Sequence, residues 1–189
     1  MKRQNSYSIK WLIDFMASGQ SPEFIFFWGH RAKQNNVTKA CFSQWWPSNF
    51  TVGRHSFATA EHWMMAQKAK LFGDQDMIAK ILETPDPGRA KGLGRKVKNF
   101  DPKLWDSKKF EIVVEGNLHK FQQNFDLKDF LLATDGKILV EASPVDRIWG
   151  IGLAQDHEDV ANPEKWRGPN LLGFALMVVR DTLKDAKDK

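Results

Sequence analysis

One helix constrains the fold of this chain more than any other segment does. The stretch TAEHWMMAQKAKLF, residues 59–72, is apolar around most of its circumference, so it predicts a helix that other elements cover on several sides. Thr59 is suited to cap the first turn, and Gly73 follows where helices commonly end in glycine. Glu61 and His62 lie in that first turn. We expect His62 to be an ordinary packed or exposed histidine, whereas a buried Glu61 needs partners or a role.

The rest of the chain predicts further helices and a few short strands. Strands are expected at residues 24–29, 40–46 and 138–142, with a hairpin where FTV and HSFA flank Gly53-Arg54. Helices are expected at residues 8–16, 59–72, 77–83, 108–122, 126–133 and 170–183, with Asp74 and Asp126 as caps. The pattern predicts an α+β fold: a single compact domain, mostly helical, with a small β-sheet built from the regions of Phe24, Ala40, Phe57 and Ile138.

The length of 189 residues is suited to one domain. We divide the chain into an N-terminal extension, residues 1–22, and a domain spanning residues 23–189. The single cysteine, Cys41, allows no disulfide framework within the chain, and no secretory signal or membrane-spanning run is present. We therefore expect a cytoplasmic protein that does not engage a membrane. We also expect neither a cofactor nor a metal ion, because the sequence contains no metal-binding or serine-hydrolase motif.

Charge and aromatic content point toward a ligand without identifying it. The net charge of +5 is compatible with phosphate-bearing partners but is too small to indicate nucleic-acid binding. The chain has 14 Phe and 8 Trp against one Tyr, and clustered Trp residues indicate either a large core or a stacking site for a flat ligand.

Glu61 is the first candidate for chemistry. Acidic residues are common in a first helical turn because they complement the helix dipole, which is the ordinary interpretation. Lys68 lies two turns further along the same face, about 10 Å away along the axis, a span that fits a small ligand or two unrelated charges. The dipole favours the ionised carboxylate, so we expect Glu61 to act as a base or to stabilise a cation.

Two further segments combine glycine with charged residues. In EASPVDRIWGIG, residues 141–152, Asp146 precedes Trp149 and two glycines, which predicts either close approach to a flat ligand or a simple turn. In GRAKGLGRKVK, residues 88–98, basic side chains alternate with glycines, which predicts either a phosphate site or a solvated helix face. The basic residues are Arg89, Lys91, Arg95, Lys96 and Lys98.

Six segments occur in a characteristic order along the chain. They are FFWG, ACFSQWWPSNF, TAEHWMMAQKAKLF, KGLGRKVKNFDPKLWD, FLLATDGKILVEASPVDRIWGIGL and NLLGFALMVVRD. In this combination the chain resembles the NADAR family, named for its association with NAD and ADP-ribose metabolism, over roughly residues 24–183. The resemblance implies an N-glycosidase with site residues at Glu61, Trp105 and Asp146. The family pattern also includes Asn49-Phe50, Lys68 and Trp149-Gly150.

The resemblance implies hydrolysis of the C1–N bond of a phosphorylated N-riboside, such as the ribosylamino-pyrimidine phosphates early in riboflavin synthesis. Two alternatives stay open: removal of ADP-ribose from guanine in nucleic acid, and a non-catalytic ADP-ribose-binding module. The expected partner is a small ribosyl phosphate or an ADP-ribosylated nucleic acid.

The resemblance also suggests how the site residues divide the work. We expect Glu61 to stabilise the oxocarbenium-like state and Asp146 to bind ribose hydroxyls or share the water. We expect Trp105 or Trp149 to stack on the base, and the segment containing Arg89 and Arg95 to take the phosphate. Lys68 would pair with Glu61 or attack the opened sugar.

Overall fold

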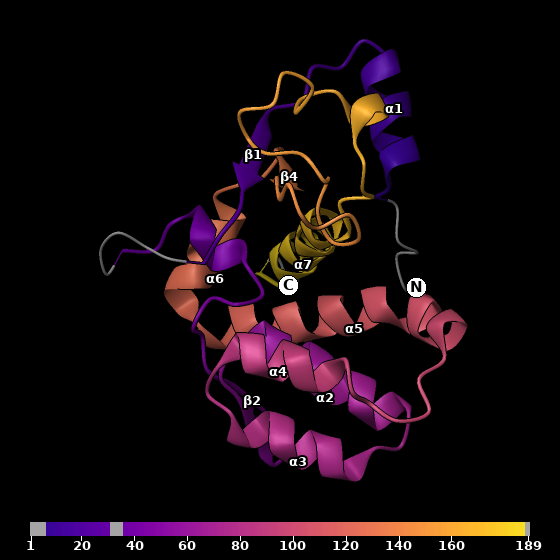
Figure 1. The fold of residues 1–189 in the computed structure, drawn as a ribbon. Helices are drawn as coiled ribbons and strands as arrows, with labels where there is room; N and C mark the ends of the chain where they lie inside the picture. The colour runs from indigo at the N-terminus through magenta and orange to yellow at the C-terminus, as the bar shows by residue number, and fades with distance from the viewer. Residues whose placement is uncertain (1–6, 31–35, 188–189) are drawn as a thin grey trace.

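The computed structural model describes residues 7–30 and 36–187 and is drawn in Figure 1. Its elements follow in the order α1 (Ile9–Ala17), β1 (Phe24–Phe27), 3₁₀ helix η1 (Lys39–Phe42), β2 (Phe50–Val52), β3 (His55–Phe57), α2 (Ala60–Leu71), α3 (Gln75–Glu83), α4 (Pro87–Gly94), α5 (Pro102–Gln123), α6 (Phe125–Leu132), β4 (Ile138–Glu141), 3₁₀ helix η2 (Pro163–Lys165) and α7 (Leu171–Lys187). The predicted α+β class, with much helix and little sheet, is confirmed.

Helix α2 is central, as its apolar circumference predicts. It packs against α3, α4 and α5, which lie around it in the lower half of Figure 1. The oxygen of Thr59 caps it, and Gly73 follows it with φ of +73°, a conformation that glycine adopts without strain. Gly94 on α4 and Gly116 on α5 allow these helices to approach α2 closely, since a Cβ would lie 2.0 Å from the sulfur of Met65 at the first and 2.2 Å from the ring of Trp63 at the second. The predicted cap at Asp74 is also confirmed.

Strands β1 and β4 form a parallel pair beside α7. Phe24 pairs with Ile138 and Phe27 with Glu141, so both strands end at the same edge. Helix α7 packs on β4 on one side and on α5 on the other, which joins the strand pair to the helical layer (Figure 1). In parallel sheets the carboxyl edge is where ligands commonly bind.

The expected strand at residues 40–46 is wrong. This segment forms η1 and a following turn, capped by the hydroxyl of Thr38. The ammonium group of Lys120, wholly buried on α5, donates to the carbonyl oxygens of Cys41 at 2.6 Å and Ser43 at 2.9 Å. These carbonyl groups are therefore satisfied by a side chain rather than by a neighbouring strand.

The expected single sheet is consequently wrong as well. The described strands form two separate pairs, β1 with β4 and β2 with β3. The predicted hairpin is confirmed: β2 and β3 are antiparallel, and Gly53 has φ of +60° in the turn.

Several helix boundaries also differ from the predictions. Helix α5 begins at Pro102 rather than residue 108, because Asp101 caps it and proline suits the first position. The N-cap of α6 is Asn124, while Asp126 lies inside its first turn. The glycine-rich basic segment begins with a capped helix, α4, whose N-cap is Asp86.

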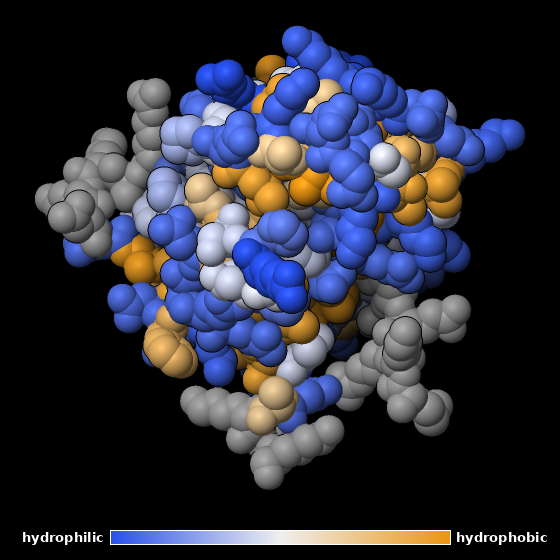
Figure 2. Space-filling view, turned by 90° about the horizontal axis from the view of Figure 1, so that it is seen from below, coloured by the Kyte–Doolittle hydropathy of each residue, from blue (hydrophilic) through white to orange (hydrophobic). Residues whose placement is uncertain are grey.

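The segment before residue 23 packs on the rest of the molecule where it is described. Leu12 of α1 is fully buried, and the hydroxyl of Tyr7 donates to Asp181 on α7 at 2.6 Å. The division between residues 22 and 23 stays a prediction, and residues 1–6 lie outside the described part. No helix among the described residues is long and apolar enough to cross a membrane. The face seen from below Figure 1 is mostly hydrophilic, with small apolar areas between (Figure 2).

Candidate active site

A cavity of about 370 Å³ opens at the carboxyl edge of the β1–β4 pair. Its walls also come from the turn after η1, the first turn of α2, helix α4 and the loop after β4. The volume lies within the range of small-ligand pockets. The side chains that matter most for chemistry here are Gln44, Trp45, Glu61, Lys91, Glu141 and Asp146.

Glu61 enters this cavity from the first turn of α2. Its backbone N–H donates to the carbonyl oxygen of Gln44 at 2.9 Å, and the residue is only 3% exposed. The Oε1 atom is buried and has no hydrogen-bond partner among the described residues. Burying such an atom is unfavourable unless a ligand or a water molecule forms a hydrogen bond with it.

Burial raises the pKa of Glu61 from 4.5 to about 7. The positive charge of Lys91 and a hydrogen bond from the Trp45 side chain oppose this, Asp146 reinforces it, and Arg95 adds a weaker opposing charge. The expectation that the helix terminus keeps Glu61 ionised is therefore wrong. Loss of solvation outweighs the dipole, so at neutral pH the carboxyl group exchanges its proton readily.

Glu141 is the second carboxyl group of the cavity, and the sequence analysis did not select it. It ends strand β4, where its N–H donates to Oδ1 of Asn170 at 3.0 Å. Asn170 is wholly buried with φ of +54°, and its Nδ2 donates to the carbonyl of Leu139, so it fixes the strand end. The Oε2 atom of Glu141 is buried without a partner among the described residues.

Burial also raises the pKa of Glu141, from 4.5 to about 8. The negative charge of Asp146 adds to the increase, Lys91 opposes it, and Glu61 adds a smaller contribution. Near neutral pH the cavity therefore holds one carboxyl group that is mostly protonated, Glu141, and one that is partly ionised, Glu61. Paired carboxyl groups of this kind are typical of acid–base catalysis.

Asp146 takes part both in a simple turn and in the wall of a ligand-sized cavity, the two alternatives that the sequence left open. Its Oδ1 accepts from the N–H groups of Ile148 at 2.8 Å and Trp149 at 2.7 Å, as in a simple turn. The residue also lines the cavity together with Trp149. Gly150 lies behind them, where a Cβ would come within 2.7 Å of the carbonyl oxygen of Glu141. Glycine is required there because the loop packs directly on the strand.

Trp45 and Lys91 provide the aromatic and cationic parts of the wall. The ring of His30 lies 5.4 Å from that of Trp45, and Nζ of Lys91 lies 5.8 Å from the Trp45 ring. Lys91 lies in the segment predicted to be basic, where Arg89 and Arg95 were the residues expected to hold the phosphate. Arg89 is exposed beside α3 in another depression, whereas Lys91 lines the cavity.

Lys68 and Trp105 lie together but outside this cavity. Nζ of Lys68 is 4.1 Å from the ring centroid of Phe100 and 5.6 Å from that of Trp105. Burial and the charge of Arg95 lower the pKa of Lys68. Lys68 forms no ion pair with Glu61. Arg95 is exposed, and its charge acts on the pKa of both Lys68 and Glu61.

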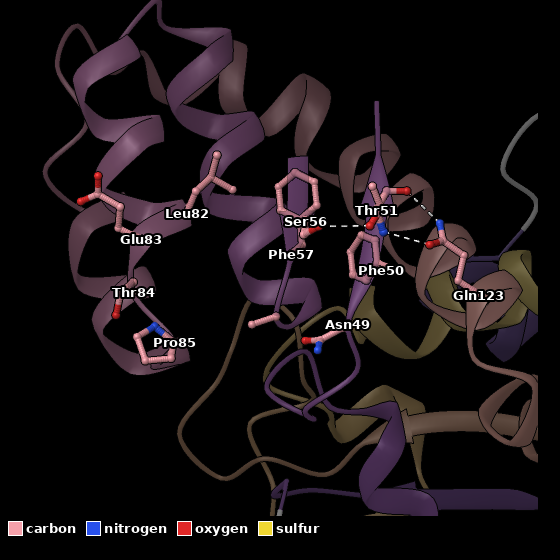
Figure 3. Close-up of a pocket in the computed structure, with 11 residues that line it drawn as sticks. Asn49, Phe50, Thr51, Ser56, Phe57, Leu82, Glu83, Thr84, Pro85 and Gln123 are labelled. Carbon is pink, nitrogen blue, oxygen red and sulfur yellow. Dashed lines mark hydrogen bonds between the residues drawn. The ribbon is translucent and has the colours of Figure 1, made fainter. Parts of the chain in front are cut away.

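Asn49 and Phe50 line a different cavity, of about 430 Å³, between the β2–β3 hairpin and the end of α3 (Figure 3). Gln123 bonds there to the backbone N–H and carbonyl of Thr51, at 2.8 and 2.9 Å. No buried, unpartnered side-chain atom of the described residues lines this second cavity, whereas three such atoms belong to residues of the first. Unsatisfied polar atoms thus mark the first cavity as the candidate site.

The described residues contain no cluster of three or more His, Cys, Asp or Glu side chains that could hold a metal ion.

The model of the NADAR domain family matches residues 26–184, which is most of the chain. The protein belongs to the NADAR family. It is 46% identical over 167 residues to an N-glycosidase of Acanthamoeba polyphaga mimivirus, covering 86% of this chain and 97% of that protein. It is 34% identical over 145 residues to an N-glycosidase of Nostoc punctiforme, covering 77% and 86%. The NMR structure of the E. coli protein YbiA matches with a TM-score of 0.70 at 26% identity, covering 90% of each chain.

The residues that the NADAR resemblance implies are only partly brought together. Glu61, Asp146 and Trp149 line one cavity, with Gly150 supporting it from behind. Two cavity residues, Glu141 and Gln44, were not predicted from the sequence, and they differ in how clearly the sequence indicates them. Glu141 ends a parallel strand, which could have indicated it, whereas the amide of Gln44 lay in a segment interpreted as a strand.

Proposed function

We propose that the protein hydrolyses the C1–N bond of a phosphorylated N-riboside, such as an early riboflavin-pathway ribosylamino-pyrimidine phosphate. The protein is a hydrolase acting on N-glycosyl bonds, the class that the names of its NADAR relatives give. The phosphorylated riboside is our inference from the cavity and its charges. The single Cys41, which is buried and free, agrees with a reducing cytoplasmic location.

The observation that carries the proposal is the pair of buried carboxyl groups. Glu61 and Glu141 each keep one buried oxygen without a partner among the described residues, and both line one cavity. Cleavage of the C1–N bond needs a proton for the leaving nitrogen and a negative charge near C1, where an oxocarbenium-like cation develops. The pKa of about 8 suits Glu141 to donate the proton, and the pKa of about 7 suits Glu61 to supply the charge.

The two glutamates and one water molecule supply every proton and bond that the reaction needs. As the C1–N bond breaks, its electron pair goes to nitrogen, which takes the proton of Glu141. The carboxylate of Glu61 stabilises the cation and accepts a proton from the attacking water, whose oxygen bonds to C1. Transfer of that proton to Glu141 through solvent restores both groups, and the products are the free base and the ribosyl phosphate.

The remaining walls fit the two ends of such a substrate. Lys91 and, further out, Arg95 supply positive charge for the phosphate. The half-buried rings of Trp45 and Trp149 offer surfaces for the base. Asp146 has its Oδ1 occupied by two backbone N–H groups, so its other oxygen is available for a ribose hydroxyl or for the water.

The second candidate is removal of ADP-ribose from guanine in nucleic acid. It is favoured by the mouth of the cavity, where Trp28 is 59% and Val145 83% exposed. A base that projects from a polymer could pack on such an open apolar rim. Arg95 and Lys96 are exposed nearby on the chain and would meet the phosphate backbone. A non-catalytic binding module is disfavoured, because the NADAR relatives carry the name N-glycosidase and two carboxyl groups with raised pKa values line one cavity.

Mass spectrometry of products decides between the two. Purified protein receives a ribosylamino-pyrimidine phosphate and guanine-ADP-ribosylated DNA in parallel, with Glu61→Ala as the inactive control. Release of ribose 5-phosphate from the first supports our proposal. Release of ADP-ribose from the second alone replaces it with the second candidate. If neither substrate reacts while ADP-ribose binds, the protein is a binding module.

A further inference from the structure

The side chain of Gln44 is a buried hydrogen-bond donor that the mechanism above does not use. Gln44 lies in the turn after η1, is 7% exposed and lines the cavity. Its backbone carbonyl accepts a hydrogen bond from the N–H of Glu61, so the two residues lie next to each other in the cavity wall. Its Nε2 atom is buried and has no partner among the described residues.

The orientation of this amide is set by a second amide behind it. Nδ2 of Asn117, which is wholly buried on α5, donates to the carbonyl oxygen of Val113 at 2.9 Å and to Oε1 of Gln44 at 2.8 Å. A backbone carbonyl can only accept, so Asn117 must present its NH₂ group on that side. Gln44 must then present its oxygen to Asn117. Its NH₂ group is left on the other side, unsatisfied.

The residues that line the cavity therefore carry one unsatisfied amide donor and two unsatisfied carboxyl oxygens. The donor is Nε2 of Gln44, the ionised carboxylate of Glu61 accepts at Oε1, and the protonated Glu141 can either donate or accept at its carboxyl group. A carbonyl group of a ligand would satisfy Gln44 but not the Glu61 carboxylate, and an amine would satisfy the Glu61 carboxylate but not Gln44. A hydroxyl group both accepts and donates, so it can satisfy Gln44 and a glutamate together.

We propose that Gln44 is a substrate-recognition residue that donates from Nε2 to a hydroxyl oxygen of the ribosyl group, whose own proton bonds to Glu61. Asn117 is a positioning residue: it does not reach the ligand but fixes which end of the Gln44 amide faces it. This inference rests on the proposed function, since it takes the ribosyl group to be the part of the substrate beside Glu61.

Gln44→Glu is the most selective perturbation. The variant keeps the shape of the side chain and an oxygen for Asn117, but it replaces the NH₂ donor with a second oxygen. Gln122→Glu, at an exposed position of the same helix as Asn117, adds the same charge away from the cavity and serves as the matched control. If Gln44→Glu does not fold, as judged by its thermal midpoint and circular dichroism, Gln44→Met removes the donor without adding charge.

The binding assay uses ribose 5-phosphate and its 2-deoxy and 3-deoxy analogues, each titrated calorimetrically. Wild type and Gln122→Glu are expected to bind ribose 5-phosphate about tenfold more tightly than one of the two analogues. In Gln44→Glu or Gln44→Met this discrimination is expected to disappear. If a Gln44 variant binds all three ligands more weakly by the same factor, Gln44 has only a structural role. That result overturns the proposal.

A direct readout separates this inference from the proposed reaction. The side-chain NH₂ signal of Gln44 in a ¹⁵N-labelled sample is assigned by its absence from Gln44→Glu, and it is followed during addition of ribose 5-phosphate and of ADP-ribose. A shift with these ligands, together with no turnover of the ribosylamino-pyrimidine phosphate in the product assay, supports recognition by Gln44 and refutes our choice of substrate. Turnover with an unmoved signal supports hydrolysis and overturns the role of Gln44. An unmoved signal with both ligands overturns it in every case.

Discussion

Replacing Glu61 by glutamine is expected to lower kcat by about 100-fold or more and yet to stabilise the protein at alkaline pH. The wild-type carboxyl group has its pKa raised from 4.5 to about 7 by burial, so the folded state holds the proton more tightly than the unfolded state. At about 1.4 kcal/mol per pH unit, this difference corresponds to a loss of about 3 kcal/mol of stability. A raised pKa leaves stability intact below pH 4.5, and the loss develops as the pH rises to about 7.

Glutamine has nearly the same shape as the protonated acid and cannot ionise. The free energies of unfolding of Glu61→Gln and wild type should therefore be similar near pH 4, and the variant should be more stable by about 3 kcal/mol above pH 8. Urea denaturation at several pH values measures this, with an expected midpoint difference of about 1 M. Glu115→Gln, at an exposed position of α5, is the matched control and should show no such trend.

Parallel stability curves for Glu61→Gln and wild type would refute the reasoning. They would mean that the Glu61 carboxylate is solvated or paired in the folded protein. A variant less stable at every pH would mean that the carboxyl group makes structural hydrogen bonds, and the assignment of its free oxygen to substrate would fail.

Three other perturbations test the account at different points. The dependence of kcat/KM on pH should be bell-shaped, rising through about pH 7 as Glu61 ionises and falling above about pH 8 as Glu141 loses its proton; a flat profile would contradict the pKa values of about 7 and 8. Lys120→Met should lose stability in urea denaturation and raise KM, because two buried carbonyl groups lose their donor at about 1–3 kcal/mol each; unchanged stability would contradict its role beneath the turn. Gly116→Ala should lose about 1–3 kcal/mol by overpacking against a fixed indole ring, measured by thermal unfolding, while Gly92→Ala on α4, where a Cβ meets open space, should gain up to about 1 kcal/mol. Equal changes in stability for the two glycine variants would show that helix propensity, and not packing against the indole ring, determines the effect of each substitution.

Local signals along the chain predicted local structure well. The cap at Thr59, the glycine at position 73 and the apolar circumference between them are all properties of neighbouring residues, and α2 follows them. The hairpin around Gly53 is similarly local, because its turn conformation depends on the glycine itself.

The failures involve interactions between residues far apart in the chain. The segment at residues 40–46 has strand-like composition, but Lys120 satisfies its carbonyl groups from 79 and 77 residues away. Glu61 appeared ionised because its helix terminus is visible in the sequence, whereas the burial that raises its pKa is a tertiary property. Glu141 was missed because the burial that raises its pKa, and the charges of Lys91 and Glu61 that act on it, come from tertiary contacts. The site is therefore assembled by tertiary contacts, and only part of it is visible as a pattern.

The central claim is that two glutamates, each with a buried carboxyl oxygen in one cavity, cleave an N-glycosyl bond. The most direct measurement is the rate of base release from a ribosylamino-pyrimidine phosphate by wild type, Glu61→Gln, Glu141→Gln and, as the control, Glu83→Gln, whose side chain lines the other cavity. The account predicts that each of the first two variants loses about 100-fold or more in kcat, while Glu83→Gln keeps the wild-type rate. Wild-type turnover in Glu61→Gln or Glu141→Gln, or a loss confined to Glu83→Gln, would contradict it.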